Sequence, residues 1–222
     1  MFRQFREFEK GEFIVIGGDL SAGGKDRSCC QFISKNRIDV PLIYDSPKMA
    51  VEMTNEIVPV LENICEVTGV KPLIAYERNN GGVFEMERLA TMNRNGTYEL
   101  FKMPVYGKEI DTEQRMKQEV RYGWDTNTAT RPMMLAALKE TIEKKIIRIY
   151  DKATIEEMYS FIVSQTSNSW KAQAERNAKD DRVMALAIAW QVFINSQPVR
   201  QARGRDYKGR RADDYDLNPM TV

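Results

Sequence analysis

The chain has 222 residues, a length that fits one large domain or two small ones. Lysine and arginine number 33 against 32 aspartates and glutamates, so the net charge of +1 excludes a globally basic nucleic-acid binder but allows a local basic patch. Histidine is absent, which excludes a Ser-His-Asp triad, histidine-ligated zinc and an imidazole general base.

The N-terminal part of the chain shows strand patterns followed by a helix pattern. Apolar, β-rich runs predict three successive strands at residues 12–20, 28–34 and 38–44. The glycine-rich turn between the first two runs is typical of a hairpin, so we expect three antiparallel strands. Residues 47–67 then have helical spacing, with Ser46 as cap, Pro47 as first residue and Pro59 as a kink or break.

The rest of the chain continues this alternation around a polar stretch. The predicted elements are a strand at 71–77, a helix at 83–93, a strand at 97–103, a loop or β-hairpin excursion at 104–128, a helix at 131–144, a strand at 146–150, a helix at 154–166, a polar connection at 167–179 and an apolar helix at 180–194. This order predicts a mixed β-sheet with helices on both faces.

Cysteine usage and hydropathy indicate the compartment. The odd count of cysteines, with Cys29 and Cys30 adjacent and Cys65 apart, argues against a disulfide framework and favours a reducing compartment. No stretch approaches the roughly 18 uncharged apolar residues of a membrane span. The first residues, MFRQFREFEKGEF, are too charged for a signal peptide.

Acidic residues stand where apolar runs end or begin. Asp19 follows the run FIVIGG, Glu77 follows PLIAY, and Asp180 and Asp181 open the last apolar helix. Residues just past strand ends collect at one edge of an α/β sheet, so we expect these acids to meet. Such a cluster needs cations to offset its repulsion, and Mg²⁺ prefers carboxylate oxygens. Two such ions hydrolyse phosphodiesters without histidine.

Each acid also has an ordinary structural explanation when it is considered alone. Asp180 and Asp181 suit the first turn of a helix, where they interact favourably with its dipole. Glu77 could be a solvated carboxylate at a strand end, and Asp19 could serve turn formation only. The joint placement and order of the four residues therefore carry the metal hypothesis.

Four segments together resemble the C-terminal nuclease domain of phage large terminases, a family with an RNase H-like fold. They are GEFIVIGGDLSAGGKDRS, PLIAYERNNGG, YGWDTNTATRPMMLAALKETI and DDRVMALAIAW, in the order of the family motifs. The resemblance spans residues 11–195 and implies an α/β fold, an RNase H-like mixed β-sheet flanked by helices on both faces.

The resemblance also implies an activity and a site. Asp19 and Glu77, together with Asp181 and the adjacent Asp180, would bind two divalent metal ions, Mg²⁺ or Mn²⁺, in a DNA endonuclease that cuts concatemeric viral DNA during genome packaging. Which of Asp180 and Asp181 binds metal directly is left open. The family often has histidine before this acidic pair, where this chain has Lys179, a residue that could hold a phosphate instead.

Partners and domain organisation follow from the same resemblance. It implies double-stranded DNA as substrate, a terminase ATPase domain, the small terminase subunit and the portal as partners, and the host-cell cytoplasm as location. The ATPase motif G-x-x-x-x-G-K-[ST] is missing, because the spacing in GGDLSAGGKD fails. We therefore expect an isolated nuclease domain at 11–197, a linker remnant at 1–10 and a flexible tail at 198–222.

Basic residues close in sequence to the acids are candidates for contacts with DNA phosphates. They are Lys25, Arg27, Arg78, Lys171, Arg176, Lys179 and Arg182. The alternative for this set is an ordinary solvated face. By resemblance, the excursion at 104–128 is a β-hairpin that contacts DNA or controls access to the site, and the alternative is a hairpin that packs its own aromatic side chains.

Three other functions are consistent with parts of the sequence. A Holliday-junction resolvase or a ribonuclease H would use a carboxylate cluster on the same fold. A sugar or acetate kinase would match the first strand and its glycine-rich turn, although the chain is short for two such domains. A non-catalytic docking module of the packaging motor would have lost its metal affinity.

Overall fold

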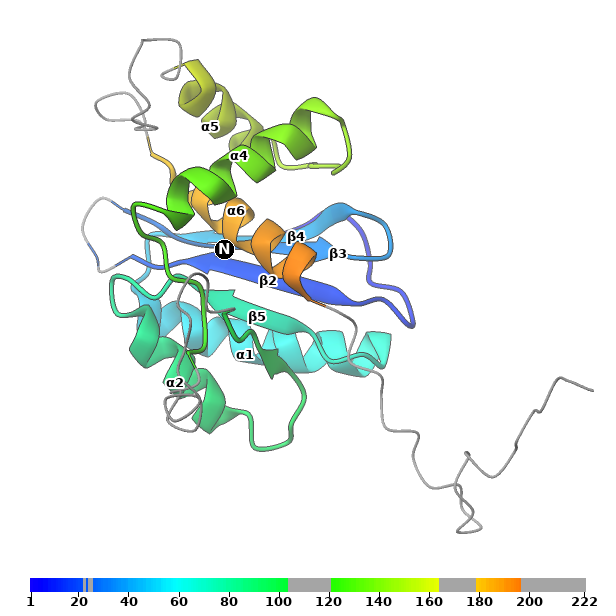
Figure 1. Cartoon of the computed structure of the whole chain (residues 1–222). Helices are drawn as coiled ribbons and strands as arrows, with labels where there is room; N and C mark the ends of the chain where they lie inside the picture. Colours follow the sequence, from blue (N-terminus) through cyan, green and yellow to red (C-terminus); the bar gives the residue numbers. More distant parts are fainter. Residues whose placement is uncertain (22, 24–25, 104–120, 164–178, 197–222) are drawn as a thin grey trace, which may run out of the picture.

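The computed structural model describes residues 1–21, 23, 26–103, 121–163 and 179–196, and its centre is a six-stranded mixed sheet (Figure 1). The strand order is β1-β4-β3-β2-β5-β6. The strands are β1 (Phe2–Gln4), β2 (Ile14–Asp19), β3 (Ser28–Ser34), β4 (Asp39–Ser46), β5 (Leu73–Tyr76) and β6 (Glu99–Leu100). The predicted antiparallel succession of β2, β3 and β4 is confirmed, whereas β5 pairs in parallel with both β2 and β6.

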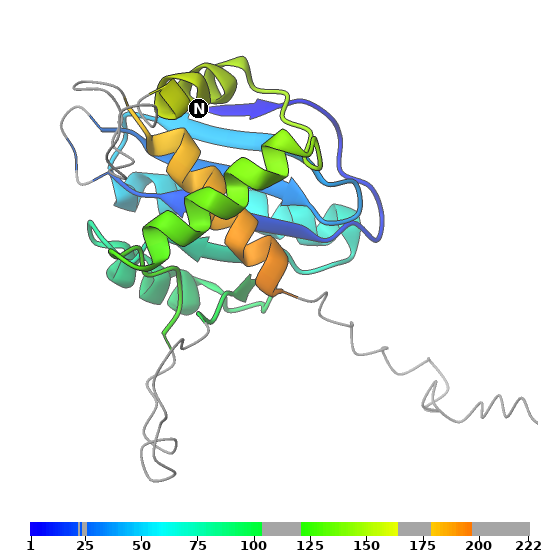
Figure 2. The same cartoon turned by 45° about the horizontal axis from the view of Figure 1, so that its top comes forward.

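Helices cover both faces of the sheet, as the order of elements predicts (Figures 1 and 2). The helices are α1 (Ala50–Thr68), α2 (Gly82–Met92), α4 (Thr130–Glu143), α5 (Lys152–Val163) and α6 (Asp181–Asn195). Alternate residues of β2 serve the two layers, because Ile14 and Ile16 join the core with α1 and α2 while Val15 joins the core with α4 and α6. None of the described helices has the length and apolar character needed to cross a membrane.

The N-terminal segment differs from the prediction. The sequence predicts a linker at 1–10, whereas Phe2–Gln4 forms β1 and pairs with Leu42–Tyr44 of β4. This pairing also explains why the strand predicted at 146–150 is wrong. Because β1 occupies the outer edge of β4, Arg148 forms only an isolated bridge with Asp39, at the start of that strand.

The start of α1 differs from the prediction, and of the two alternatives at Pro59 the break does not occur. The last residue of β4 is Ser46, so the helix begins later, with Met49 at the cap position and the Glu52 carboxylate accepting the Met49 N–H at 3.2 Å. The helix continues without a break through Pro59. The burial of Met53 and Leu61 on one face holds it together, since tertiary packing supplies most of a helix's stability.

The strand predicted at 97–103 is shorter than expected, but its end pairs with the far end of the polar excursion. Lys102 forms an antiparallel bridge with Tyr122, and Gly123 donates its N–H to the Phe101 carbonyl at 3.0 Å. These contacts are those of a hairpin stem. The predicted hairpin itself, at 104–120, lies outside the described residues, as do the tail from 197 and most of the polar connection at 167–179.

The last helix lies directly against the central strand. A Cβ atom added at Gly17 of β2 would stand 2.1 Å from the Ala189 nitrogen and 2.5 Å from the Ala185 oxygen. The bare strand backbone and two alanines therefore allow this close approach. The contact fixes α6 across β2 and carries the start of α6, at Asp181, to the edge of the sheet where β2 ends.

Candidate metal centre

Two carboxylates lie side by side where adjacent parallel strands end. The register of β2 and β5 pairs Gly18 with Tyr76, so Asp19 and Glu77 are the next residues on each strand. The Glu77 N–H donates to the Gly18 carbonyl at 2.7 Å, which keeps the two chains at strand spacing beyond the last pair. Parallel pairing thus brings together two acids that are far apart in the sequence.

The raised pKa of Asp19 reflects the other acids that lie close to it. Burial raises the pKa of Asp19 well above its usual value, and the charge of Glu77 raises it further. A hydrogen bond between the Asp19 and Glu77 carboxyl groups and the charges of Asp181 and Asp180 add to the upward shift of the pKa of Asp19. An acid that is partly buried among other acids either keeps a proton or requires a cation beside it.

The start of α6 supplies the other two acids. Asp181 is buried and accepts the Arg27 N–H at 3.1 Å, while burial and the neighbouring charge of Asp180 raise the pKa of Asp181. Asp180, at the cap position of the helix, accepts a hydrogen bond from Arg131 Nη2 of α4 at 2.7 Å. Each of these carboxylates therefore already has a hydrogen-bond partner.

One pair of carboxyl groups, those of Asp19 and Glu77, has the chemistry of ligands for a divalent cation. Asp19 and Glu77 offer two hydrogen-bonded carboxyl groups, and oxygen ligands of this type suit Mg²⁺. As the side chains stand, no group of three or more histidine, cysteine, aspartate or glutamate residues in the described part of the chain is arranged to hold a metal ion. A larger ligand set requires Asp180 or Asp181 to turn away from its present partner.

A tight turn fixes the orientation of Glu77. Asn79 Nδ2 donates to Glu77 Oε1 at 3.4 Å and to the Thr126 carbonyl at 3.1 Å. The turn closes when Gly82 donates its N–H to the Asn79 carbonyl at 2.8 Å. Only glycine fits at position 82, because an added Cβ would stand 1.6 Å from the Glu77 carbonyl oxygen. The sequence RNNGG after Glu77 is thus explained by this turn.

Asp45 shows which acid at this edge has a structural role. It lies near the end of β4, at the same edge as Asp19, and is bound by Arg27 Nε at 2.5 Å and Arg182 Nη2 at 2.6 Å. Burial alone would raise the pKa of Asp45, but these hydrogen bonds outweigh burial and lower it. Two acids at one edge thus have opposite pKa shifts, and of the two only Asp19 lacks a basic partner among the described residues.

The predicted basic residues have varied surroundings. Besides Asp45, Arg182 contacts Glu157 at 2.8 Å, and Arg78 Nη1 donates to the Tyr122 carbonyl at 2.8 Å. These two side chains and Arg27 therefore hold the framework around the acids. Lys179 is exposed immediately before α6. Lys25, Lys171 and Arg176 lie outside the described residues.

Two residues of the site were missed by sequence reasoning. Arg131 lies in the segment that resembles the third family motif, but a single arginine in a polar stretch carries no specific signal. Asp45 had a usable signal, because it follows an apolar strand just as Asp19 does. The pattern gives the position of such an acid but not whether an arginine neutralises it.

Comparison with known proteins identifies the fold. No protein-family model matches the chain, and a search of curated proteins finds no match. The large terminase nuclease of the thermophilic phage G20c is similar in structure, with a TM-score of 0.61 and 14% identity over 86% of this chain and 87% of that chain. Its magnesium-bound structure gives a TM-score of 0.60 at 14% identity, covering 86% of both chains.

A second phage protein gives the same result. The large terminase nuclease domain of Thermus phage P74-26 matches with a TM-score of 0.58 and 12% identity over 90% of this chain and 89% of that chain. These similarities confirm the resemblance to terminase nuclease domains at the level of the fold. The predicted class, an RNase H-like α/β fold, is confirmed with it.

Proposed function

We propose that this chain is a metal-dependent DNA endonuclease of the large terminase type, which cuts concatemeric viral DNA during genome packaging. The observation that carries the proposal is the pair Asp19–Glu77, two hydrogen-bonded carboxyl groups with no basic partner for Asp19 among the described residues. The fold supports it, since similar nuclease domains include one solved with bound magnesium. An acid that is costly to ionise in the metal-free protein is a strong candidate ligand.

The residues near the ends of β2 and β5 have two kinds of role, metal binding and the orientation of the ligands. Asp19 and Glu77 would hold two divalent ions, Mg²⁺ or Mn²⁺, together with Asp181 and Asp180. When bound, such ions would activate a water molecule for attack and offset the charge that develops on the phosphodiester. Asn79 orients the Glu77 carboxylate, and the Arg27 amide orients that of Asp181. Fixed second contacts of this kind tune ligands in metal sites.

The proposal extends to substrate and partners. It assigns double-stranded DNA as substrate, the host-cell cytoplasm as location, and a terminase ATPase domain, the small terminase subunit and the portal as partners. Lys179 lies next to the acidic pair and is a candidate contact for the phosphate that is cut. Lys25, Lys171 and Arg176 are further candidates for the DNA backbone.

A cleavage assay with four substrates tests this proposal. We expect the protein with Mg²⁺ or Mn²⁺ to nick and linearise supercoiled plasmid and to cut linear duplex DNA, and we expect chelator to abolish both activities. A four-way junction and an RNA–DNA hybrid, tested in parallel, should be cut more slowly than the duplex. Preferential cutting of the junction or the hybrid would replace the terminase activity with a resolvase or ribonuclease H activity.

Replacing Arg131 should strengthen metal binding. Its guanidinium competes with a metal ion for the Asp180 carboxylate, and both side chains are about one-third exposed. A pair of this exposure contributes up to about 1 kcal/mol, so Arg131→Gln should raise Mn²⁺ affinity up to about fivefold in a calorimetric titration. Arg131→Lys, which keeps a cation, is the control and should change affinity less. Unchanged affinity in Arg131→Gln would contradict a competition between Arg131 and the metal ion for Asp180.

A further inference from the structure

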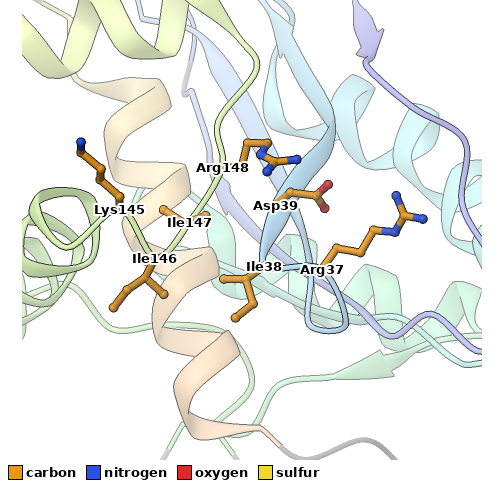
Figure 3. Close-up of a pocket in the computed structure, with 7 residues that line it drawn as sticks. All are labelled: Arg37, Ile38, Asp39, Lys145, Ile146, Ile147 and Arg148. Carbon is orange, nitrogen blue, oxygen red and sulfur yellow. The ribbon is translucent and has the colours of Figure 1, made fainter.

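A pocket of about 510 Å³ lies at one end of the strands, and the acids lie at the other end (Figure 3). It is lined by Arg37, Ile38, Asp39, Lys145, Ile146, Ile147 and Arg148. Asp39 begins β4, whose other end carries Asp45, so the length of that strand separates the pocket from the proposed metal centre. Its volume is in the range of ligand sites, about 300–1,000 Å³.

The lining combines positive charge with apolar surface. Arg37, Lys145 and Arg148 are exposed, and Figure 3 shows the two arginines near Asp39 while Lys145 lies on the other side of the isoleucines. The Asp39 carboxylate is already bound by Arg6 at 2.6 Å, so it leaves the pocket positive. Ile146 is 45% exposed, which gives the pocket an apolar surface between its cations.

The Arg37 side chain has a partner that it can exchange. It pairs with Glu9, and both side chains are about half exposed. Exposed pairs of this kind contribute little to stability, so another carboxylate can replace Glu9 at little cost. The pocket therefore offers three cations to an acidic ligand.

The backbone around the pocket is held in an unusual conformation. Ile38 and Lys145 both have φ of +53°, and they are two of the three non-glycine residues with positive φ in the described part of the chain. For a β-branched residue such as isoleucine this conformation is a real outlier. Strained backbone tends to mark binding sites, where the surrounding structure maintains it for function. The pocket thus has an independent sign of a binding role.

We propose that this pocket binds the acidic segment Asp213–Leu217 of the same chain. Its sequence, DDYDL, carries three carboxylates for the three cations and two apolar side chains for the isoleucines. Free duplex DNA fits less well, because a phosphate backbone has nothing to place against the exposed Ile146. Charge and apolar character together thus favour an acidic peptide.

The course of the chain brings this segment within reach. Helix α6 ends at Asn195, and the Lys35 ammonium group, two residues before Arg37, donates to the carbonyls of Phe193 and Ser196 at 2.6 and 2.5 Å. The chain therefore leaves α6 beside the pocket. Residues 197–212 can span up to about 3.3 Å each, and a tethered ligand has an effective concentration in the millimolar range. Weak individual contacts suffice under these conditions.

Peptide binding to the full chain tests the proposal. The probe is a fluorescent peptide of residues 212–222, and the variant Asp213→Asn/Asp214→Asn/Asp216→Asn removes the charge of the chain's own segment. We expect this variant to bind the probe at least tenfold more tightly than the wild-type chain, in which the segment competes. A peptide of residues 200–211, which is basic, is the matched control and should bind neither protein.

Charge reversal in the pocket is the second part of the peptide-binding test. Added to the charge-neutral tail, Lys145→Glu/Arg148→Glu should weaken probe binding at least tenfold, whereas Lys139→Glu/Lys144→Glu, on exposed surface outside the pocket, should leave it within twofold. Circular dichroism checks folding, and Arg148→Gln replaces the double variant if that variant is unfolded. Cleavage activity is not the readout, so the result is separate from the proposed nuclease function.

Several outcomes would overturn this assignment. Equal probe binding by the wild-type chain and the charge-neutral variant would show that the segment does not occupy the pocket. Equal loss in the two charge-reversal pairs would show that binding follows overall charge. If a short duplex bound in a manner dependent on Lys145 and Arg148 while the peptide did not bind, the pocket would be a nucleic-acid site.

Discussion

Asp19→Asn should lose cleavage by about a thousandfold or more. Metal-bound carboxylates support several kcal/mol of transition-state stabilisation, and 1.36 kcal/mol corresponds to a factor of ten in rate. The amide keeps the size of the side chain but not its charge, so the strongest candidate ligand is lost while the packing of β2 is retained. The measurement is plasmid nicking at saturating Mn²⁺, together with calorimetry of Mn²⁺ binding, which should weaken in parallel.

The same substitution should change how stability depends on pH. The folded protein binds the Asp19 proton more tightly than the unfolded chain does, because the pKa of Asp19 is raised. The metal-free wild type therefore loses stability as the pH rises from the unfolded pKa, about 3.9, through the raised folded pKa. Asp19→Asn has no such group, so its urea midpoint should fall less over this interval.

Asp39→Asn is the matched control for Asp19→Asn. Asp39 is a buried acid of the same sheet at the opposite edge, and its carboxylate is held by Arg6 and by the Tyr150 hydroxyl at 3.0 Å. Its replacement should lower stability and leave cleavage per folded molecule nearly unchanged. A well-folded Asp19→Asn protein with full activity would remove the metal centre from this edge.

Gly17→Ala should destabilise the protein by about 3 kcal/mol or more. The added methyl carbon meets the backbone of α6 at 2.1 Å from the Ala189 nitrogen, and backbone cannot move aside as a flexible side chain can. Overpacking usually costs about 1–3 kcal/mol, and this contact is at the severe end. Displacement of α6 also moves Asp181, so the free energy of unfolding and Mn²⁺ affinity should fall together in urea titration and calorimetry.

Gly96→Ala separates this steric effect from the general cost of replacing a glycine. Gly96 has φ of +62°, and an added Cβ would have only the Lys71 ammonium within 4 Å, at 3.6 Å. The left-handed conformation should cost about 1–2 kcal/mol and leave metal binding unchanged. Wild-type stability in Gly17→Ala would show that α6 approaches β2 less closely than the 2.1 Å contact implies.

Sequence reasoning placed Asp19 and Glu77 side by side because their positions follow from strand ends. Asp19 and Glu77 each come directly after a short apolar run, and parallel pairing of the two strands makes them neighbours. It misjudged Phe2–Gln4, since three residues among charged neighbours show no strand pattern and form β1 only because β4 offers a free edge. Local pattern is sufficient for the first case, whereas the second depends on tertiary context.

The basic residues show a different limit. Arg27 and Arg182 lie close to the acids in the sequence, which made them candidates for phosphate contacts, yet the structure pairs both with Asp45. Sequence separation between Arg182 and Asp45 hides this contact, because only the folded sheet brings the start of α6 to the end of β4. The partners of a charged side chain therefore cannot be derived from its neighbours in the sequence.

The ion pairs that Arg182 forms with β4 and α5 affect how the protein responds to heat. This residue follows Asp181 directly and connects the start of α6 with Asp45 of β4 and Glu157 of α5. Loosening of α5 alone would free that corner while β2 and β5 stay paired, since structures open locally before they melt globally. We therefore expect cleavage activity to be lost on warming at a temperature some degrees below that of global unfolding. The activity should return on cooling.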